Sequence, residues 1–234
     1  MKNRNLFAGI LTSASLLILT ACVSKHYSNQ EHDRSWYSEK LTKDNCIIVL
    51  VDFLTGFDPG IKTIDTLTFY HNVTAYAKIS QIFKLPTIVL GDEGGFRGNF
   101  YSAVRKYTTN ASFIERQTPS AWRVESFQSF LAKTGRKKVI LGGISLDNCT
   151  LHTSLDLIQN GYQVYVCVDV SPCENVLVQQ AAIMRLQQAG AVMISWGSIA
   201  AEIMGDWRSE EGSAVGQLYQ DHSVYGGELK PIGR

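Results

Sequence analysis

Short runs of apolar, β-branched residues alternate along the chain with longer segments in which apolar residues recur at helical spacing. The run at 46–53, Cys-Ile-Ile-Val-Leu-Val-Asp-Phe, is continuously apolar up to its aspartate, the pattern of a strand buried on both faces. Similar runs occur at 85–90, 138–141, 162–168 and 191–194, with a weaker one at 111–115. Strands that alternate with helices form right-handed βαβ units, so the sequence predicts an α/β domain with a parallel sheet of about six strands.

Helices are predicted between these strands, because apolar side chains three or four residues apart lie on one helix face. Three segments show this spacing: Phe69, Val73, Tyr76 and Phe83; Val124, Phe127 and Leu131; Val178, Ala181, Ala182 and Leu186. Glycines at 135, 161 and 190 follow predicted helices, where a helix C-terminus favours a residue with positive φ. The helices are expected to cover both faces of the sheet.

Composition narrows the class of protein further. Of the 234 residues, 45% are hydrophobic and 18% are charged, which excludes a disordered chain, a collagen-like fibre and a coiled coil. The formal charge of +1 gives no basic field of the kind that binds nucleic acid, so no nucleic-acid partner is expected. Five cysteines are too few for a disulfide framework in a chain of this length.

The first residues have the features of a secretion signal. Lys2 and Arg4 precede an apolar run at 6–19, which is shorter than the ~20 residues that span a bilayer. The run ends in Leu-Thr-Ala-Cys at 19–22, which resembles the lipobox of bacterial lipoproteins, in which the cysteine is lipidated and becomes the new N-terminus. We therefore expect lipidation of Cys22. An ordinary cleaved signal with a chance cysteine is the alternative.

This interpretation divides the chain into four parts. They are a lipoprotein signal peptide at 1–21, a polar tether at 22–44, the α/β domain at 45–208 and a Gly-rich tail at 209–234, interpreted as an assembly arm. Val23 follows the cysteine where an aspartate would favour retention in the inner membrane. We therefore expect a lipid anchor in the bacterial cell envelope, on the periplasmic face of the outer membrane.

Three reactive side chains follow different predicted strands. Asp52 ends the first run, Arg116 follows the weak run, and Cys149 follows the run at 138–141, where a helix is expected to begin. Ligands bind beyond the carboxyl ends of parallel strands, so all three are expected at one rim. Each has an ordinary alternative: a capping aspartate, a surface arginine and a small buried cysteine. Together they form a cysteine nucleophile, because a helix N-terminus lowers a thiol pKa and a carboxylate held ionised by a cation can take its proton.

Several motifs resemble the isochorismatase-like cysteine hydrolases. They are Val-Leu-Val-Asp-Phe at 49–53, Lys-Val-Ile-Leu-Gly-Gly-Ile-Ser-Leu-Asp-Asn-Cys at 138–149 and Val-Tyr-Val-Cys-Val-Asp at 164–169. Arg-Gln-Thr-Pro-Ser-Ala-Trp at 116–122, Ala-Gly-Ala-Val-Met-Ile-Ser-Trp-Gly at 189–197 and Asp-Trp at 206–207 resemble the YcaC-like branch, whose substrates are poorly defined. The resemblance implies a three-layer α/β/α fold with a six-stranded, mostly parallel Rossmann-like sheet in the order 3-2-1-4-5-6.

The resemblance also implies a role for each residue of the site. Asp52 is the general base, Cys149 the nucleophile that forms a thioacyl intermediate, and Arg116 the cationic member of the triad. A non-proline cis peptide is implied between Ile144 and Ser145, where it directs the N–H groups of Ser145 and Cys149 at a developing oxyanion. The implied reaction is hydrolysis of a C–N bond in a small, non-peptide amide.

The chain departs from the family at two positions. Many members have a lysine in the triad, whereas Arg116 cannot lose its proton at working pH. Leu146 stands where a threonine is common. The Asp-x-His plus His spacing that supplies metal ligands in nicotinamidases has no counterpart after Asp52, so neither a metal nor a cofactor is expected.

Other residues are assigned around the triad. Phe53, Trp122 and Asn148 flank it and are expected to line the substrate pocket, with core packing as the alternative for the two aromatic residues. The segment Gly-Asp-Glu-Gly-Gly at 91–95 lacks the spacing of a dinucleotide-binding loop and is interpreted as a mobile loop at the pocket rim. A catalytic dyad of Cys149 and His152 is not expected, because residues on the same helix rarely orient their side chains toward each other for proton transfer. His152 is instead expected to be packed or exposed.

The remaining cysteines raise a redox question. Cys46 and Cys167 lie in predicted strands and are expected to be inert. Cys173 follows the fifth predicted strand at the same rim as Cys149, so a reversible disulfide between them and plain packing beneath the loop are both open.

Two classes of function remain open. The first is the cysteine hydrolase, with a small-molecule substrate, a lipid anchor and assembly into a homo-oligomer. The second is a non-catalytic scaffold or binding lipoprotein that has kept the fold, since fold alone does not determine function. Rapid reaction of Cys149 with iodoacetamide would favour the enzyme.

Overall fold

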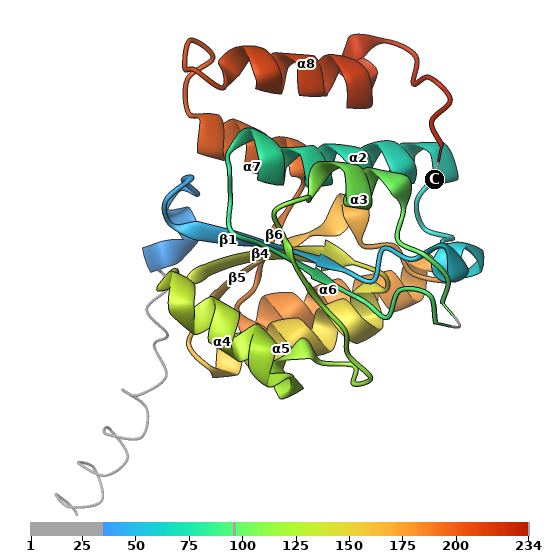
Figure 1. Ribbon diagram of the computed structural model, residues 1–234, viewed down its shortest axis with the longest axis vertical. Coiled ribbons are helices and arrows are strands. Elements are labelled where there is room, and N and C mark those ends of the chain that lie inside the picture. The colour runs from blue at the N-terminus through green and yellow to red at the C-terminus, as the bar shows by residue number, and fades with distance from the viewer. Residues whose placement is uncertain (1–34, 96, 234) are drawn as a thin grey trace, which may run out of the picture. The chain divides into compact units, whose positions relative to one another are not determined.

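One parallel sheet of six strands organises the part of the chain that the structure describes, residues 35–95 and 97–233 of a computed structural model (Figure 1). The order is β3-β2-β1-β4-β5-β6, and every neighbouring pair is parallel. The strands are β1 (Cys46–Val51), β2 (Thr87–Leu90), β3 (Ser112–Ile114), β4 (Lys138–Gly143), β5 (Gln163–Cys167) and β6 (Val192–Ile194). The predicted number, direction and order of the strands are confirmed.

Helices cover both faces of this sheet. In Figure 1, α2 (Thr66–Ile82), α3 (Ser102–Tyr107), α7 (Trp196–Met204) and α8 (Gly212–His222) lie on one side of it. On the other side lie α4 (Glu125–Thr134), α5 (Leu151–Gln159) and α6 (Val176–Ala189). Three of these helices, α2, α4 and α6, occupy the segments predicted from apolar spacing. The fold is the three-layer α/β/α arrangement that the resemblance implied.

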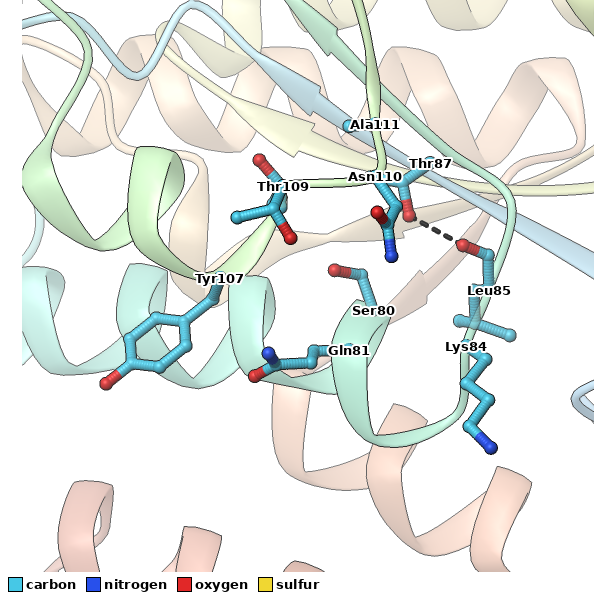
Figure 2. A pocket seen from close by; sticks show the side chains of 10 residues that line it. Ser80, Gln81, Lys84, Leu85, Thr87, Tyr107, Thr109, Asn110 and Ala111 are labelled. Atoms are coloured by element: carbon cyan, nitrogen blue, oxygen red, sulfur yellow. Dashed lines mark hydrogen bonds between the residues drawn. The ribbon is translucent and has the colours of Figure 1, made fainter.

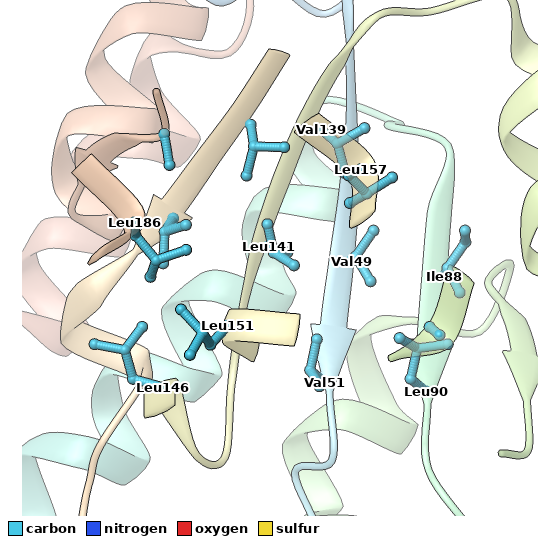
Figure 3. Packing of buried hydrophobic residues seen from close by; sticks show 14 of the residues in the cluster. Val49, Val51, Ile88, Leu90, Val139, Leu141, Leu146, Leu151, Leu157 and Leu186 are labelled. Atoms are coloured by element: carbon cyan, nitrogen blue, oxygen red, sulfur yellow. The ribbon is translucent and has the colours of Figure 1, made fainter. Parts of the chain in front are cut away.

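An apolar layer fills the space between the sheet and the helices α4, α5 and α6 (Figure 3). Alternate residues of the central strands point into it: Val49, Val51, Ile88, Leu90, Val139 and Leu141. On the opposite face, Tyr76 of α2 is completely buried, and its hydroxyl donates to the Val49 carbonyl oxygen at 3.1 Å. Because both faces are sealed, polar chemistry is confined to the ends of the strands.

The packed unit extends beyond the predicted domain at both ends. It begins at Lys40 rather than 45, and Leu41 is completely buried. The expected tail forms α8, in which Val215 and Leu218 are buried against the same unit.

The predicted signal peptide, Cys22 and most of the tether lie outside the described residues. Ser35–Ser38, in the described part of the tether, form a short 3₁₀ helix. Within the described ranges, no helix is long and apolar enough to cross a membrane.

Candidate active site

Asp52, Arg116 and Cys149 lie together at the carboxyl edge of the sheet. Asp52 follows β1 directly, and Arg116 lies two residues beyond β3. Cys149 lies in a π-helical turn, η4 (Leu146–Thr150), between β4 and α5. All three side chains line one open cavity of about 190 Å³. The topology of the parallel sheet therefore brings together residues that are far apart in sequence.

The Asp52 carboxylate and the Arg116 guanidinium form a buried ion pair. Their side chains are 8% and 5% exposed, and Arg116 Nη2 donates to Asp52 Oδ2. Arg116 Nη1 donates to the carbonyl oxygen of Thr118, so two nitrogen atoms hold the guanidinium in place. Burial raises the pKa of Asp52, while the positive charge of Arg116 acts in the opposite direction. The pair therefore keeps a carboxylate available in a site that would otherwise favour its neutral form.

The Cys149 thiol contacts both members of this ion pair. It is half-buried and within hydrogen-bonding reach of the Asp52 carboxylate and of Arg116. Burial, and then the negative charge of Asp52, raise the pKa of Cys149 to about 11, although Arg116 opposes both effects. The expectation that a helix N-terminus lowers this pKa is therefore wrong, because burial beside a carboxylate outweighs it. At neutral pH the site holds a thiol whose nearest proton acceptor is Asp52.

Tight contacts hold the turn that carries the cysteine. Gly143 ends β4 so close to β1 that a Cβ atom there would lie 1.8 Å from the Val51 carbonyl oxygen. Thr150 Oγ1 donates to the Gly143 carbonyl oxygen at 3.0 Å. The peptide bond between Ile144 and Ser145 is cis, at the position that the resemblance implied. At the position where the family commonly has a threonine, the leucine side chain is completely buried in the core.

The three residues expected to line the pocket separate in the structure. Asn148 lines the cavity beside Cys149. Phe53 is 1% exposed and packs against three aromatic rings from α2 and the start of α3, so its assignment to the pocket is corrected to the core. Trp122 packs against the core and against Tyr162, with 5.9 Å between ring centroids, and is likewise a packing residue. Core packing, the alternative given for these two aromatic residues, is therefore the position that the structure shows.

The wall of the cavity contains residues that we did not single out in the sequence. Phe57, Asp92, Arg97 and Gln117 all line it. Asp92 lies in the segment interpreted as a loop at the pocket rim, and Arg97 follows that segment. An arginine among glycines just beyond the carboxyl end of β2 was the available signal for this wall.

The other described cysteines are buried. Those of β1 and β5 are completely buried, and so is Cys173, whose thiol donates to Asp147 Oδ1 at 3.3 Å. All four described cysteines are free thiols, and Cys173 has the packed position that was the alternative to a disulfide with Cys149. His152 is exposed on α5. Among the described residues, no group of three or more His, Cys, Asp or Glu side chains could hold a metal ion.

A second, smaller depression lies near the amino end of β2 (Figure 2). It has a volume of about 140 Å³ and is lined mainly by polar side chains of α2 and of the segment 107–111. Ser80 Oγ donates to the Ala77 carbonyl oxygen at 2.7 Å, and Thr87 Oγ1 donates to that of Leu85 at 2.8 Å. Its lining contains neither a cysteine nor a carboxylate. We therefore place the candidate active site in the cavity that contains Cys149.

Comparison with known proteins agrees with this fold. Residues 78–198 match the isochorismatase domain family. The protein described as "Probable hydrolase YcaC" from Escherichia coli (strain K12) is 31% identical over 186 residues, which cover 78% of this chain and 88% of the relative. The structure of YcaC from Pseudomonas aeruginosa with hexane-2,5-diol and covalent acrylamide superposes with a TM-score of 0.74 at 30% identity. The superposition covers 78% of this chain and 91% of that one.

The Escherichia coli YcaC gene product, described as an octameric hydrolase of unknown specificity, gives the same TM-score of 0.74 at 30% identity. That superposition covers 79% of this chain and 91% of the other. Together these features define a hydrolase of the three-layer α/β/α class. The chain belongs to the isochorismatase family and is similar to its YcaC-like members.

Proposed function

We propose that the protein is a cysteine hydrolase that cleaves the C–N bond of a small, non-peptide amide. The observation that carries this proposal is the position of the Cys149 thiol against Asp52 and Arg116 on the wall of one cavity. A cavity of about 190 Å³ is smaller than the ~300 Å³ typical of the smallest drug-sized pockets. These dimensions support a small substrate.

In the proposed reaction, Cys149 Sγ attacks the amide carbonyl carbon while the thiol proton passes to Asp52. The N–H groups of Ser145 and Cys149 stabilise the oxyanion. Asp52 then gives the proton to the amine nitrogen as the C–N bond breaks, which leaves a thioacyl intermediate. Water attacks that intermediate and loses a proton to Asp52. The same proton passes to the leaving Cys149 sulfur, and the carboxylic acid is released.

Arg116 has a positioning and electrostatic role in this reaction. Its two hydrogen-bonded nitrogen atoms fix the direction of the guanidinium, and its charge favours the ionised form of Asp52. Because a guanidinium keeps its proton at working pH, Arg116 does not transfer one. The proton cycle therefore needs only Cys149 and Asp52.

A panel of small amides, assayed for release of ammonia or amine by the purified protein, tests this proposal. Cys149→Ala should abolish turnover, while Cys167→Ala, at a completely buried position in β5, should retain it in protein that remains folded. Iodoacetamide should label Cys149 first, because the other three described cysteines are buried. A protein that turns over no amide and whose Cys149 is no faster than the buried thiols would instead be a scaffold or binding protein.

We also propose that Cys22 carries the lipid anchor and places the domain at the periplasmic face of the outer membrane. The support is the lipobox-like sequence at 19–22. Metabolic labelling with a radioactive fatty acid should mark the full chain and not a Cys22→Ala variant. Equal labelling of both proteins would contradict lipidation at this residue.

A homo-oligomer is the assembly that we propose. The octameric state of the Escherichia coli relative supports it, and so does the outer face of α6, where Val176, Leu177 and Met184 are between 57% and 76% exposed. The helix contains no acidic residue and only Arg185 as a charge, so two copies could pack there without strong repulsion. Light scattering of Met184→Glu should show a smaller particle than the wild type, whereas Gln187→Glu on the same helix should not.

A further inference from the structure

Helix α5 lies beside both the nucleophile and the segment that carries Arg116. The π-helical turn with Cys149 leads directly into α5, so Thr153 is only one helical turn beyond the nucleophile. Leu151 and Leu157 of this helix are buried in the apolar layer against the sheet (Figure 3). Helix α5 is therefore a firm support, because its apolar face is packed in the core.

Two side chains of α5 hold the segment that follows Arg116. Thr153 is completely buried, and its Oγ1 accepts a hydrogen bond from the Ala121 N–H at 3.1 Å. Asp156 Oδ2 accepts one from Ser120 Oγ at 2.6 Å, the length of a charge-assisted bond. The two bonds therefore attach this segment to the helix that begins directly after the nucleophile.

Further hydrogen bonds continue from this attachment to the guanidinium of Arg116. Thr118 Oγ1 donates to the Ser120 carbonyl oxygen at 2.7 Å, and the Thr118 carbonyl oxygen accepts from Arg116 Nη1. The other terminal nitrogen of Arg116 donates to Asp52. A series of hydrogen-bonded groups thus runs from α5 to the ion pair beside Cys149.

The sheet supports the backbone near Arg116 from one side only. Strand β3 has three residues, lies at an edge of the sheet and pairs with β2, and Arg116 lies two residues beyond its end. Placement of this guanidinium is important, because a displacement of about 1 Å in an active site can lower a rate by about a hundredfold. The bonds to α5 supply support on the other side.

We propose that Thr153 and Asp156 are positioning residues, which hold the Arg116 guanidinium against Asp52 by fixing the segment 116–121 to α5. This inference rests on the proposed amide hydrolysis. Neither Thr153 nor Asp156 is among the residues that line the cavity, so both act on the reaction through Arg116. Without their two bonds, Arg116 can move away from Asp52, and the burial of this carboxyl group then favours its neutral form.

The pKa of Asp52 reports the position of Arg116 and can be measured without any turnover. Carbon NMR of protein labelled at the aspartate carboxyl carbons gives this pKa, and Asp52→Asn assigns the signal. A cation in contact lowers a carboxyl pKa by about 1–3, so a displaced guanidinium should raise it by about one, which is tenfold tighter binding of the proton. Thr153→Val should show this rise, because valine has no acceptor for the Ala121 N–H. Thr153→Ser keeps the hydroxyl and should return the pKa to the wild-type value.

Asp156→Ala is a second test at a half-buried position, where loss of the side chain leaves the core intact. It should also raise the pKa of Asp52. Asp156→Asn removes the same charge but keeps an oxygen acceptor for the Ser120 hydroxyl, so it should leave this pKa near the wild-type value.

Thr74→Val is the matched control. Thr74 is 4% exposed on α2, on the other side of the sheet, and its hydroxyl donates to the Tyr70 carbonyl oxygen of its own helix at 2.7 Å (Figure 1). This variant also loses a buried hydroxyl, but it should leave the pKa of Asp52 unchanged. An unchanged or lower pKa of Asp52 in Asp156→Ala or in folded Thr153→Val would overturn the positioning role. An equal rise in Thr74→Val would overturn it as well.

Turnover of a small amide by the same proteins is measured separately. We expect Thr153→Val to lower kcat by about tenfold and to change KM by less than about twofold, because Thr153 does not line the cavity. A raised pKa of Asp52 in the variants, without turnover by the wild type, would contradict the proposed hydrolysis and leave the positioning role intact. Turnover by the wild type, with an unchanged pKa of Asp52 in the variants, would support the hydrolysis and overturn the positioning role.

Discussion

Acidification should loosen the attachment of α8 to α2, because the neutral ring of His222 forms part of it. His71 Nδ1 lies 2.9 Å from His222 Nδ1, and Lys78 Nζ lies 2.8 Å from His222 Nε2. Since an ammonium group can only donate, His222 Nε2 accepts and the proton of this ring is on Nδ1. His71 therefore accepts at Nδ1, and its Nε2 donates to the Lys230 carbonyl oxygen at 2.8 Å. Each ring is hydrogen-bonded at both nitrogens.

The expected loss of folding stability on acidification follows from the pKa of His222. Burial, the charge of Lys78 and the neighbouring His71 lower this pKa to about 4 from the ordinary 6.5, while Asp221 opposes them. At this histidine the unfolded chain thus binds a proton more readily than the folded chain. The contribution of His222 to stability is therefore fully present above pH 6.5 and is lost as the pH falls towards 4. The difference corresponds to about 3 kcal/mol. Because Lys78 and Asp221 are partly exposed, solvent screens part of the effect, and we expect about 2 kcal/mol.

Urea unfolding between pH 7.5 and 4.5 measures this effect by comparison of variants. His222→Gln should be less stable than the wild type by about 1–3 kcal/mol at pH 7.5, because it disrupts the bonds to Lys78 and His71. Its disadvantage should shrink by about 2 kcal/mol as the pH falls, since only the wild type carries the titrating group. The exposed His152, replaced by glutamine, is the control and should follow the wild type throughout. A difference between His222→Gln and the wild type that does not change with pH would refute this reasoning.

Three further predictions concern the site and its support. Asp52→Asn should abolish turnover and also move the pKa of Cys149 below about 11, because a nearby negative charge is removed. Thiolate absorbance measured against pH gives this pKa, and an unchanged or higher value would count against the contact between Asp52 and Cys149. Arg116→Lys should lower kcat by about tenfold or more, because an ammonium group cannot reproduce two bonds from a rigid guanidinium; full activity by steady-state assay would contradict the positioning role. Gly143→Ala should cost more than about 3 kcal/mol in urea unfolding, because its Cβ atom meets a β1 carbonyl oxygen, whereas Gly60→Ala, with open space around it, should cost little.

The sheet was predictable because its central strands, β1, β2, β4 and β5, are buried and each lies in an apolar run of the sequence. Even the weak run at 111–115 became β3, at an edge of the sheet where it pairs with one neighbour. Helix α8 was not predicted, because Gly212 and Gly216 weaken its helical character and the tail is polar overall. The spacing of Val215, Leu218 and His222 was the signal that could have shown its buried face.

The site was predictable to the extent that its residues are attached to strand ends. Because all strands are parallel, their carboxyl ends place Asp52, Arg116 and Cys149 at one edge, although 64 residues separate the first two. The pKa of Cys149 was not predictable, because it depends on burial and on the distance to one carboxylate. Arg97 was missed for a related reason: it lies on a loop whose position is set by contacts at Gly56 and not by the sheet. We therefore expect the loop after β2, rather than the three strand-end residues, to determine which small molecule this site accepts.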